Sequence, residues 1–181
     1  MSVENFTEEH VYPIGKFKKK DHYSLEEIQA GIDRIELLPM HLSDTARLMT
    51  TEQLSASYRP GGWTGRQIIH HVADSHLNMY ARLKLALTED TPTIKPYLQD
   101  GWAEFEEARY GEIESSLTLI AILHHRIVKV LRDLDKQAFQ RAYFHPEMQR
   151  KVELSEMVCS YAWHGDHHCA QLQVIRQIFP G

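Results

Sequence analysis

The clearest evidence for the fold of this chain lies in residues 157–179, which read MVCSYAWHGDHHCAQLQVIRQIF. Apolar and histidine side chains recur there at helical spacing, at Met157, Tyr161, His164, His168, Leu172, Ile175 and Phe179. This spacing predicts a long amphipathic helix. Two imidazoles four residues apart lie on one face of a helix, close enough to bind one ion together. Because both occupy positions where core residues belong, their ring nitrogens need a metal ion or hydrogen-bond partners.

A second segment, residues 63–88, places another histidine on an inward helical face. Thr64 and Gln67 form a capping box that predicts the start of a helix. The inward stripe predicted for this helix consists of Ile68, His71, Val72, Ser75, Met79, Leu83 and Ala86. His71 is therefore the candidate third ligand. His70 points about 100° away, and we expect it to be a surface or supporting group that can hydrogen-bond Asp74.

Three imidazoles from two helices favour a divalent transition-metal ion. Neutral imidazole suits Zn²⁺, Ni²⁺ or Fe²⁺, whereas Mg²⁺ and Ca²⁺ prefer oxygen ligands. Three protein ligands leave one coordination position open, as in catalytic zinc sites. Gly165 stands where zinc proteases carry a glutamate, so that class of protease is disfavoured. The alternative is a set of hydrogen-bonded core histidines without a metal. His167 lies beside the stripe and is a weaker candidate ligand.

The composition is typical of one soluble globular domain. The 181 residues contain 43% apolar and 25% charged side chains, and the formal net charge of −5 disfavours binding to nucleic acid. No apolar run is long enough to cross a membrane and no signal-peptide pattern is present, so we expect a cytoplasmic protein without a membrane partner. Cys159 and Cys169 lie about 15 Å apart on one predicted helix, too far for a disulfide.

The hydrophobic pattern as a whole predicts an all-α fold, a four-helix bundle. Capping signals and periodicity predict helices that begin near Ser24, Thr64, Ser115 and Ser155. We expect Pro39 to interrupt the first of them, because proline has no backbone N–H to donate. Bundles commonly place metal sites in their core, with ligands from facing helices.

Shorter features separate these helices. Residues 139–153 predict a small hairpin-like insertion before the last helix, and residues 88–112 form a long connection with a short helix near 102–108. A connection of this length is either an active-site lid or a plain crossover. We expect an irregular N-terminal segment over residues 1–22 and one bundle domain over residues 23–181.

Several longer phrases resemble the YfiT-like group of the DinB superfamily: YPIG at 12–15, YRPGGWT at 58–64, HHVADSH at 70–76, ALTEDTPTI at 86–94 and YAWHG at 161–165. The resemblance covers the chain from about residue 11 onward. It implies a DinB-type bundle in which His71, His164 and His168 hold one divalent metal ion per subunit, zinc or else nickel. It also implies a homodimer.

The same resemblance implies a metal-dependent hydrolase or a bacillithiol S-transferase. We expect the transferase, in which the metal stabilises the thiolate of bacillithiol for attack on an electrophile, because no carboxylate base accompanies the ligands in these motifs. Arg59 is a candidate to bind a substrate carboxylate, and Trp63 and Trp102 are candidates to wall the pocket. Asp166 stands where the resemblance implies a basic residue; it either orients an imidazole or faces solvent.

Two other functions stay open at the level of sequence. A metal-dependent hydrolase would use activated water and needs a nearby base such as Asp74 or Glu89. A non-catalytic metal-binding stress protein would fill the fourth coordination position with a protein group.

Overall fold

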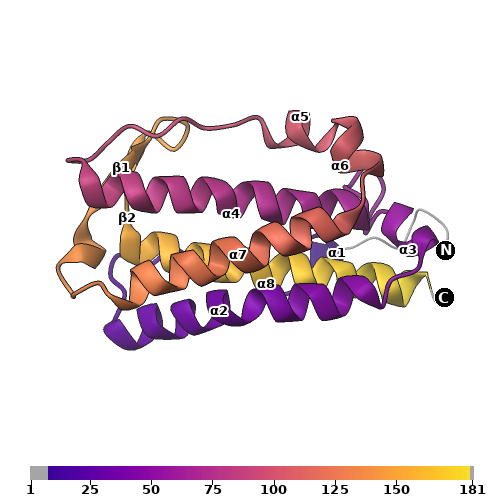
Figure 1. The fold of residues 1–181 in the computed structure, drawn as a ribbon, viewed down its shortest axis with the longest axis horizontal. Helices are drawn as coiled ribbons and strands as arrows, with labels where there is room; N and C mark the ends of the chain where they lie inside the picture. Colours follow the sequence, from indigo (N-terminus) through magenta and orange to yellow (C-terminus); the bar gives the residue numbers. More distant parts are fainter. Residues whose placement is uncertain (1–7, 180–181) are drawn as a thin grey trace.

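Four long amphipathic helices pack into a bundle in the computed structural model, which describes residues 8–179 (Figure 1). They are α2 (Leu25–Arg47), α4 (Gly65–Thr88), α7 (Ile113–Arg132) and α8 (Leu154–Ile178). Both α2 and α4 pack against α7 and against α8. The predicted all-α four-helix bundle is therefore confirmed. Residues 1–7, which belong to the predicted irregular segment, and residues 180–181 lie outside the described residues.

The direction of the helices explains the long connection after α4. Figure 1 shows that α4 and α7 run in the same direction, opposite to α2 and α8. The chain must therefore return along the length of the bundle between α4 and α7, so residues 89–112 form a crossover. Two short helices, α5 (Gln99–Ala103) and α6 (Glu106–Tyr110), lie in it. The prediction of a single short helix near 102–108 was wrong, because the backbone is extended at Phe105.

Capping boxes fix the starts of two long helices as predicted. The hydroxyl of Ser24 accepts from the backbone of Glu27, and that of Thr64 accepts from Gln67. A third capping box, at Thr50, starts the short helix α3 (Thr51–Ser55). The predicted cap at Ser155 was wrong, because α8 begins directly after the last strand, at Leu154, and has no side-chain cap.

The interruption predicted at Pro39 does not occur. α2 runs without a break through Pro39. Ile35, Leu38 and Leu42, on either side of the proline, are fully buried, and their packing holds the helix together. Because Pro39 lacks an N–H, the carbonyl of Ile35 loses its helical hydrogen bond and needs another donor.

The predicted hairpin is present between α7 and α8. A short turn of 3₁₀ helix, η2 (Ala138–Gln140), leads into β1 (Ala142–His145), which pairs antiparallel with β2 (Arg150–Glu153). Phe144 of β1 also pairs with Thr93 of the crossover, so the hairpin anchors the chain that follows α4. Near the N-terminus, α1 (Glu8–Val11) is a single helical turn that packs against α8.

Two apolar clusters fill the bundle, and a layer of histidines lies between them. One cluster, near the hairpin, includes Met79 and Tyr161; the other, toward α3, includes Val72 and Leu172. His76 and the pair at 164 and 168 occupy the intervening helical turns. Cys159 and Cys169 are free thiols. None of the described helices combines the length and the hydropathy that a membrane span requires.

Candidate metal centre

Three imidazole rings from α4 and α8 meet in this layer. The Nε2 atom of His164 lies 3.1 Å from Nε2 of His71 and 3.2 Å from Nε2 of His168. One ring nitrogen from each residue lies within 4.8 Å of the other two. His71 and His168 are buried, whereas His164 is half-buried and lines a pocket. The structure thus brings together the three histidines that the sequence selected as candidate ligands.

The buried rings are neutral near pH 7. Desolvation is the main cause that lowers the pKa values of His71, His164 and His168 well below the usual range, and neighbouring imidazoles add to the effect. Burial likewise lowers the pKa of His76 and brings that of His124 to about 4. Each ring therefore carries one proton, on one nitrogen only.

Gln171 fixes the tautomer of His168. The amide nitrogen of Gln171 donates to the backbone oxygen of Val11 at 3.2 Å, and its side-chain oxygen lies 2.8 Å from Nδ1 of His168. An amide oxygen can only accept, so Nδ1 of His168 carries the proton. Nε2 of His168 therefore presents a lone pair to the other two rings.

A longer chain of hydrogen bonds fixes His164 and begins at Pro39. Nδ1 of His124 donates to the Ile35 carbonyl, which Pro39 leaves free, at 2.5 Å. Nε2 of His124 is thus an acceptor, and Nδ1 of His76 donates to it at 2.8 Å. Nε2 of His76 in turn accepts from Nδ1 of His164 at 3.3 Å. Nε2 of His164 is left as a lone pair, directed at His71 and His168.

The donor set fits a divalent transition-metal ion. Two imidazole lone pairs 3.2 Å apart, as on His164 and His168, repel each other unless a cation or proton lies between them. Nitrogen ligands at about 2.0–2.1 Å from a tetrahedral zinc ion are roughly 3.3 Å apart. The observed nitrogen spacings of 3.1 and 3.2 Å are close to that value. Nitrogen donors of this kind suit zinc, nickel or iron.

One of the three tryptophans, Trp63, packs against the histidine group. The ring of Trp63 lies 4.4 Å from His71 and 6.4 Å from His168, centroid to centroid, so Trp63 walls the histidine group. His167 is stacked on Trp163 at 4.8 Å and does not join the group. Trp102 packs against Tyr97 in the crossover instead of against the histidines.

For three other residues, the structure shows contacts that differ from a role considered for them in the sequence analysis. His70 is buried, and its Nδ1 contacts the Ser116 hydroxyl at 2.8 Å, so the hydrogen bond expected to Asp74 is not formed. Asp166 forms an ion pair with Arg34 at 2.6 Å and does not orient an imidazole. Arg59 folds back on the neighbouring Tyr58 ring and does not line the pocket beside His164.

The two carboxylates considered as bases do not join the histidine group either. Burial and the negative charge of Glu107 raise the pKa of Asp74 to about 6. Glu89 is exposed at the C-terminal end of α4. Among the described residues, no carboxylate oxygen completes a ligand group with the three imidazoles.

Sequence reasoning missed the supporting histidines, although their spacing contained the signal. His76 continues the helical series from Val72 to Met79, and all three are buried. His124 falls in the same way between Ile120 and Ile127 on α7. A polar residue on a buried helical face needs a hydrogen-bond partner, and these two histidines are partners of each other.

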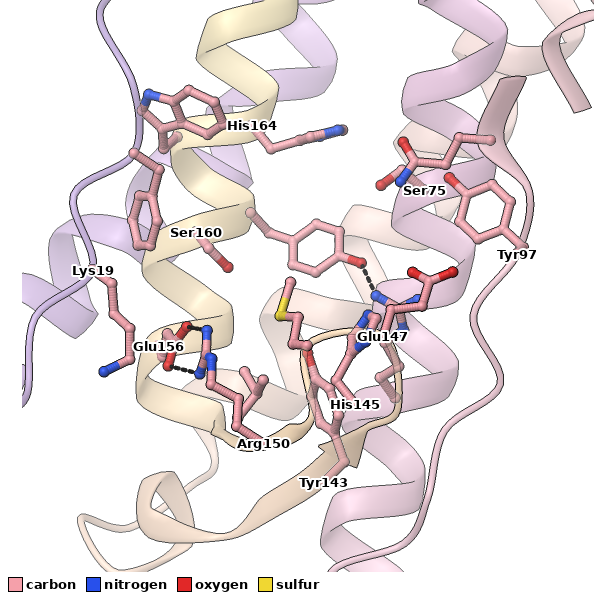
Figure 2. Close-up of a pocket in the computed structure, with 17 residues that line it drawn as sticks. Lys19, Ser75, Tyr97, Tyr143, His145, Glu147, Arg150, Glu156, Ser160 and His164 are labelled. Carbon is pink, nitrogen blue, oxygen red and sulfur yellow. Dashed lines mark hydrogen bonds and ion pairs between the residues drawn. The ribbon is translucent and has the colours of Figure 1, made fainter. Parts of the chain in front are cut away.

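A pocket of about 280 Å³ opens beside His164. Figure 2 shows Ser160 and His164 of α8 on one side, Ser75 of α4 with Tyr97 on the other, and the hairpin closing the end. Arg150 of the hairpin pairs with Glu156 of α8 at 2.6 and 2.8 Å. One ring of the candidate metal centre, that of His164, therefore borders this cavity.

Comparison with known proteins gives close relatives over almost the whole chain. The DinB superfamily model matches residues 34–172. The chain is 40% identical over 161 residues to the Bacillus subtilis protein named "Putative metal-dependent hydrolase YfiT", covering 89% of this chain and 90% of that one. A relative from Oceanobacillus iheyensis with the same kind of name is 46% identical over 161 residues, covering 89% and 92%.

A solved structure matches this fold. It is YfiT from Bacillus subtilis, described as "a probable metal-dependent hydrolase with an unusual four-helix bundle topology". The TM-score is 0.91 at 38% identity, and the match covers 94% of this chain and 97% of that one.

Proposed function

This chain belongs to the DinB superfamily, and we propose that it is a metal-dependent enzyme that transfers a small thiol, bacillithiol, onto electrophilic carbon. One observation carries the proposal. Ring nitrogens of His71, His164 and His168 converge, and the half-buried member of the three borders a pocket. We propose zinc as the ion that these residues hold, with nickel as the second choice.

The ion and the protein have separate tasks in this proposal. A divalent ion with an open coordination position supplies Lewis acidity, which lowers the pKa of a thiol or water bound to it. The three histidines would hold it, and the ring of Trp63, which does not line the pocket, packs against His71. The thiol proton would pass to solvent, the thiolate sulfur would form a bond to the electrophilic carbon, and the leaving group would depart with its electron pair.

The surroundings of the histidines support thiol transfer over hydrolysis. Activation of water usually requires a base within hydrogen-bonding reach. Of the acidic residues that line the pocket, Glu156 is held by Arg150, and Glu147 is exposed in the hairpin turn. A thiol needs no such base, because its pKa is much closer to neutrality than that of water.

A conjugation assay tests the proposal. Protein loaded with zinc or nickel is mixed with bacillithiol and monochlorobimane, and formation of the fluorescent conjugate is followed. We expect turnover by the native chain and by His125→Ala, which removes an exposed histidine of α7, and none by His71→Ala. Equal rates for the native chain and His71→Ala would refute the transferase.

Hydrolysis is the second candidate, because the relatives are named as metal-dependent hydrolases. The transferase requires an added thiol and the hydrolase does not, so this requirement distinguishes the two activities. Ester or amide cleavage by the metal-loaded protein without any added thiol, lost in His71→Ala, would favour the hydrolase.

We also propose a homodimer, in line with the family resemblance. Sedimentation should then give twice the chain mass of 21.1 kDa. A species of 21.1 kDa at all concentrations would contradict it.

A further inference from the structure

Buried polar atoms without partners gather in the pocket beside His164. Five such side-chain atoms occur among the described residues. Three of them belong to residues that line this one pocket: Nε of Arg82, Nδ1 of His145 and the hydroxyl of Tyr97, which has the Ser75 hydroxyl nearby. Buried polar groups in folded proteins are nearly always hydrogen-bonded, so this concentration needs an explanation. Each of the three can donate a hydrogen bond.

Arg82 also brings a positive charge to this pocket, whose lining carboxylates are those of Glu147 and Glu156. Its Nη1 donates to the Tyr161 hydroxyl at 3.0 Å, which is a neutral partner. No described carboxylate lies within ion-pair distance of its guanidinium, whereas Arg150 in the same pocket is neutralised by Glu156. A partly buried cation without a counter-ion is costly, and an anionic ligand would remove that cost.

The three groups come from separate parts of the chain and are held in place by the fold. Arg82 lies on α4, Tyr97 on the crossover and His145 at the end of β1. The pairing of the crossover with Phe144 of β1 anchors Tyr97 near the hairpin. Burial is the main cause that lowers the pKa of His145, followed by the charge of Arg82, so its ring adds a donor without adding charge.

We propose that Arg82, Tyr97 and His145 form a carboxylate-binding subsite, which holds the anionic end of the substrate while its reactive atom reaches the corner beside His164. The placement of the reactive atom beside His164 rests on the proposed function, whereas binding of a carboxylate by the three residues does not. A planar guanidinium flanked by neutral donors matches a carboxylate in shape and charge. Lys19 lines the pocket from the N-terminal segment, and its ion pair within the described residues is an exposed contact with Asp21, so it adds a second positive charge.

The pocket also connects this subsite to the metal centre. The ring of Tyr161, whose hydroxyl accepts from Arg82, lies 5.9 Å from the ring of His164, centroid to centroid. Both side chains line the same cavity. A small molecule in this cavity can therefore contact both Arg82 and the ring of His164.

Titration calorimetry tests the subsite with succinate and its neutral analogue succinamide. The metal-loaded native chain should bind succinate at least tenfold more tightly than succinamide. Arg82→Met should lose that preference. Arg126→Met, which removes an exposed arginine that lies over the Tyr80 ring, should keep it. All proteins are compared at equal metal content, because a carboxylate can also bind the ion directly.

The possible results distinguish failure of the carboxylate subsite from failure of the proposed thiol transfer. Equal affinities of the native chain for succinate and succinamide, or an unchanged preference in Arg82→Met, overturn the subsite even where thiol transfer is present. The expected preference without any thiol transfer supports the subsite and refutes the proposed function. If Arg82→Met does not fold, Tyr97→Phe replaces it and should weaken succinate several-fold with succinamide unchanged; no loss for succinate overturns the subsite.

Discussion

Each histidine that we propose as a ligand on α8 is oriented by a group on the far side of its ring. Gln171 does this for His168, and His76 does it for His164. Such partners fix the tautomer and commonly change metal affinity by 10–100-fold when removed, as a rough guide. The residue scale therefore offers a test that does not depend on the reaction.

Replacing His76 with phenylalanine should weaken zinc binding by roughly tenfold or more, because Nδ1 of His164 loses its acceptor. His76→Gln, whose amide oxygen can accept the same hydrogen bond, should recover part of the loss. Competition with a chromophoric chelator measures both. His125→Phe, an exposed histidine, is the matched control, and an unchanged affinity in His76→Phe would contradict the account.

Among the elements, α2 has the unexpected role, because a proline inside it supplies the free carbonyl that anchors His124. Pro39→Ala restores an N–H that can bond to Ile35. The helix should become more stable by about 1–3 kcal/mol, while zinc affinity should fall because His124 loses its acceptor. Thermal unfolding of the metal-free protein and chelator competition measure the two effects. Affinity that rises or stays constant would show that the Ile35 carbonyl does not orient the site.

The contact between α2 and α8 is close at Gly165. A Cβ atom there would lie 2.3 Å from Cδ2 of Leu38, whose side chain is buried in the core. Gly165→Ala should therefore lower the unfolding free energy of the metal-free protein by about 1–3 kcal/mol. Gly101→Ala is the control, since its added Cβ would meet only an ordinary contact at 3.5 Å. Equal denaturant midpoints for the two variants would exclude this close approach.

For the molecule as a whole, the buried histidines make stability depend on pH. Folding lowers the pKa of His124 and His167 to about 4 from the usual 6.5, so below pH 6.5 the unfolded chain binds more protons. The metal-free protein should lose stability as the pH falls from 6.5 to 4. Asp74, with its pKa raised to about 6, opposes this trend but is a single group. Urea midpoints that stay flat or rise over this interval would be inconsistent with neutral buried rings.

Much of this molecule follows from local sequence signals. Helical spacing placed His71, His164 and His168 on inward faces, and hydroxyl caps marked the starts of α2 and α4. Local signals fail where tertiary contacts outweigh them. Packing on both sides of Pro39 keeps α2 whole.

The pocket residues could not be found from periodicity. Arg82, Tyr97 and His145 lie on three different elements and meet only because the crossover pairs with the hairpin. Such a convergence depends on the direction in which the helices run, and no spacing within one helix encodes it.

X-ray absorption at the zinc edge of the zinc-loaded protein tests the metal centre most directly, together with the metal content per chain. We predict one zinc ion per chain with three imidazole nitrogens at about 2.0–2.1 Å and one further light ligand that is not histidine. A sulfur ligand, a fourth imidazole, or less than stoichiometric zinc after loading would contradict the site formed by His71, His164 and His168.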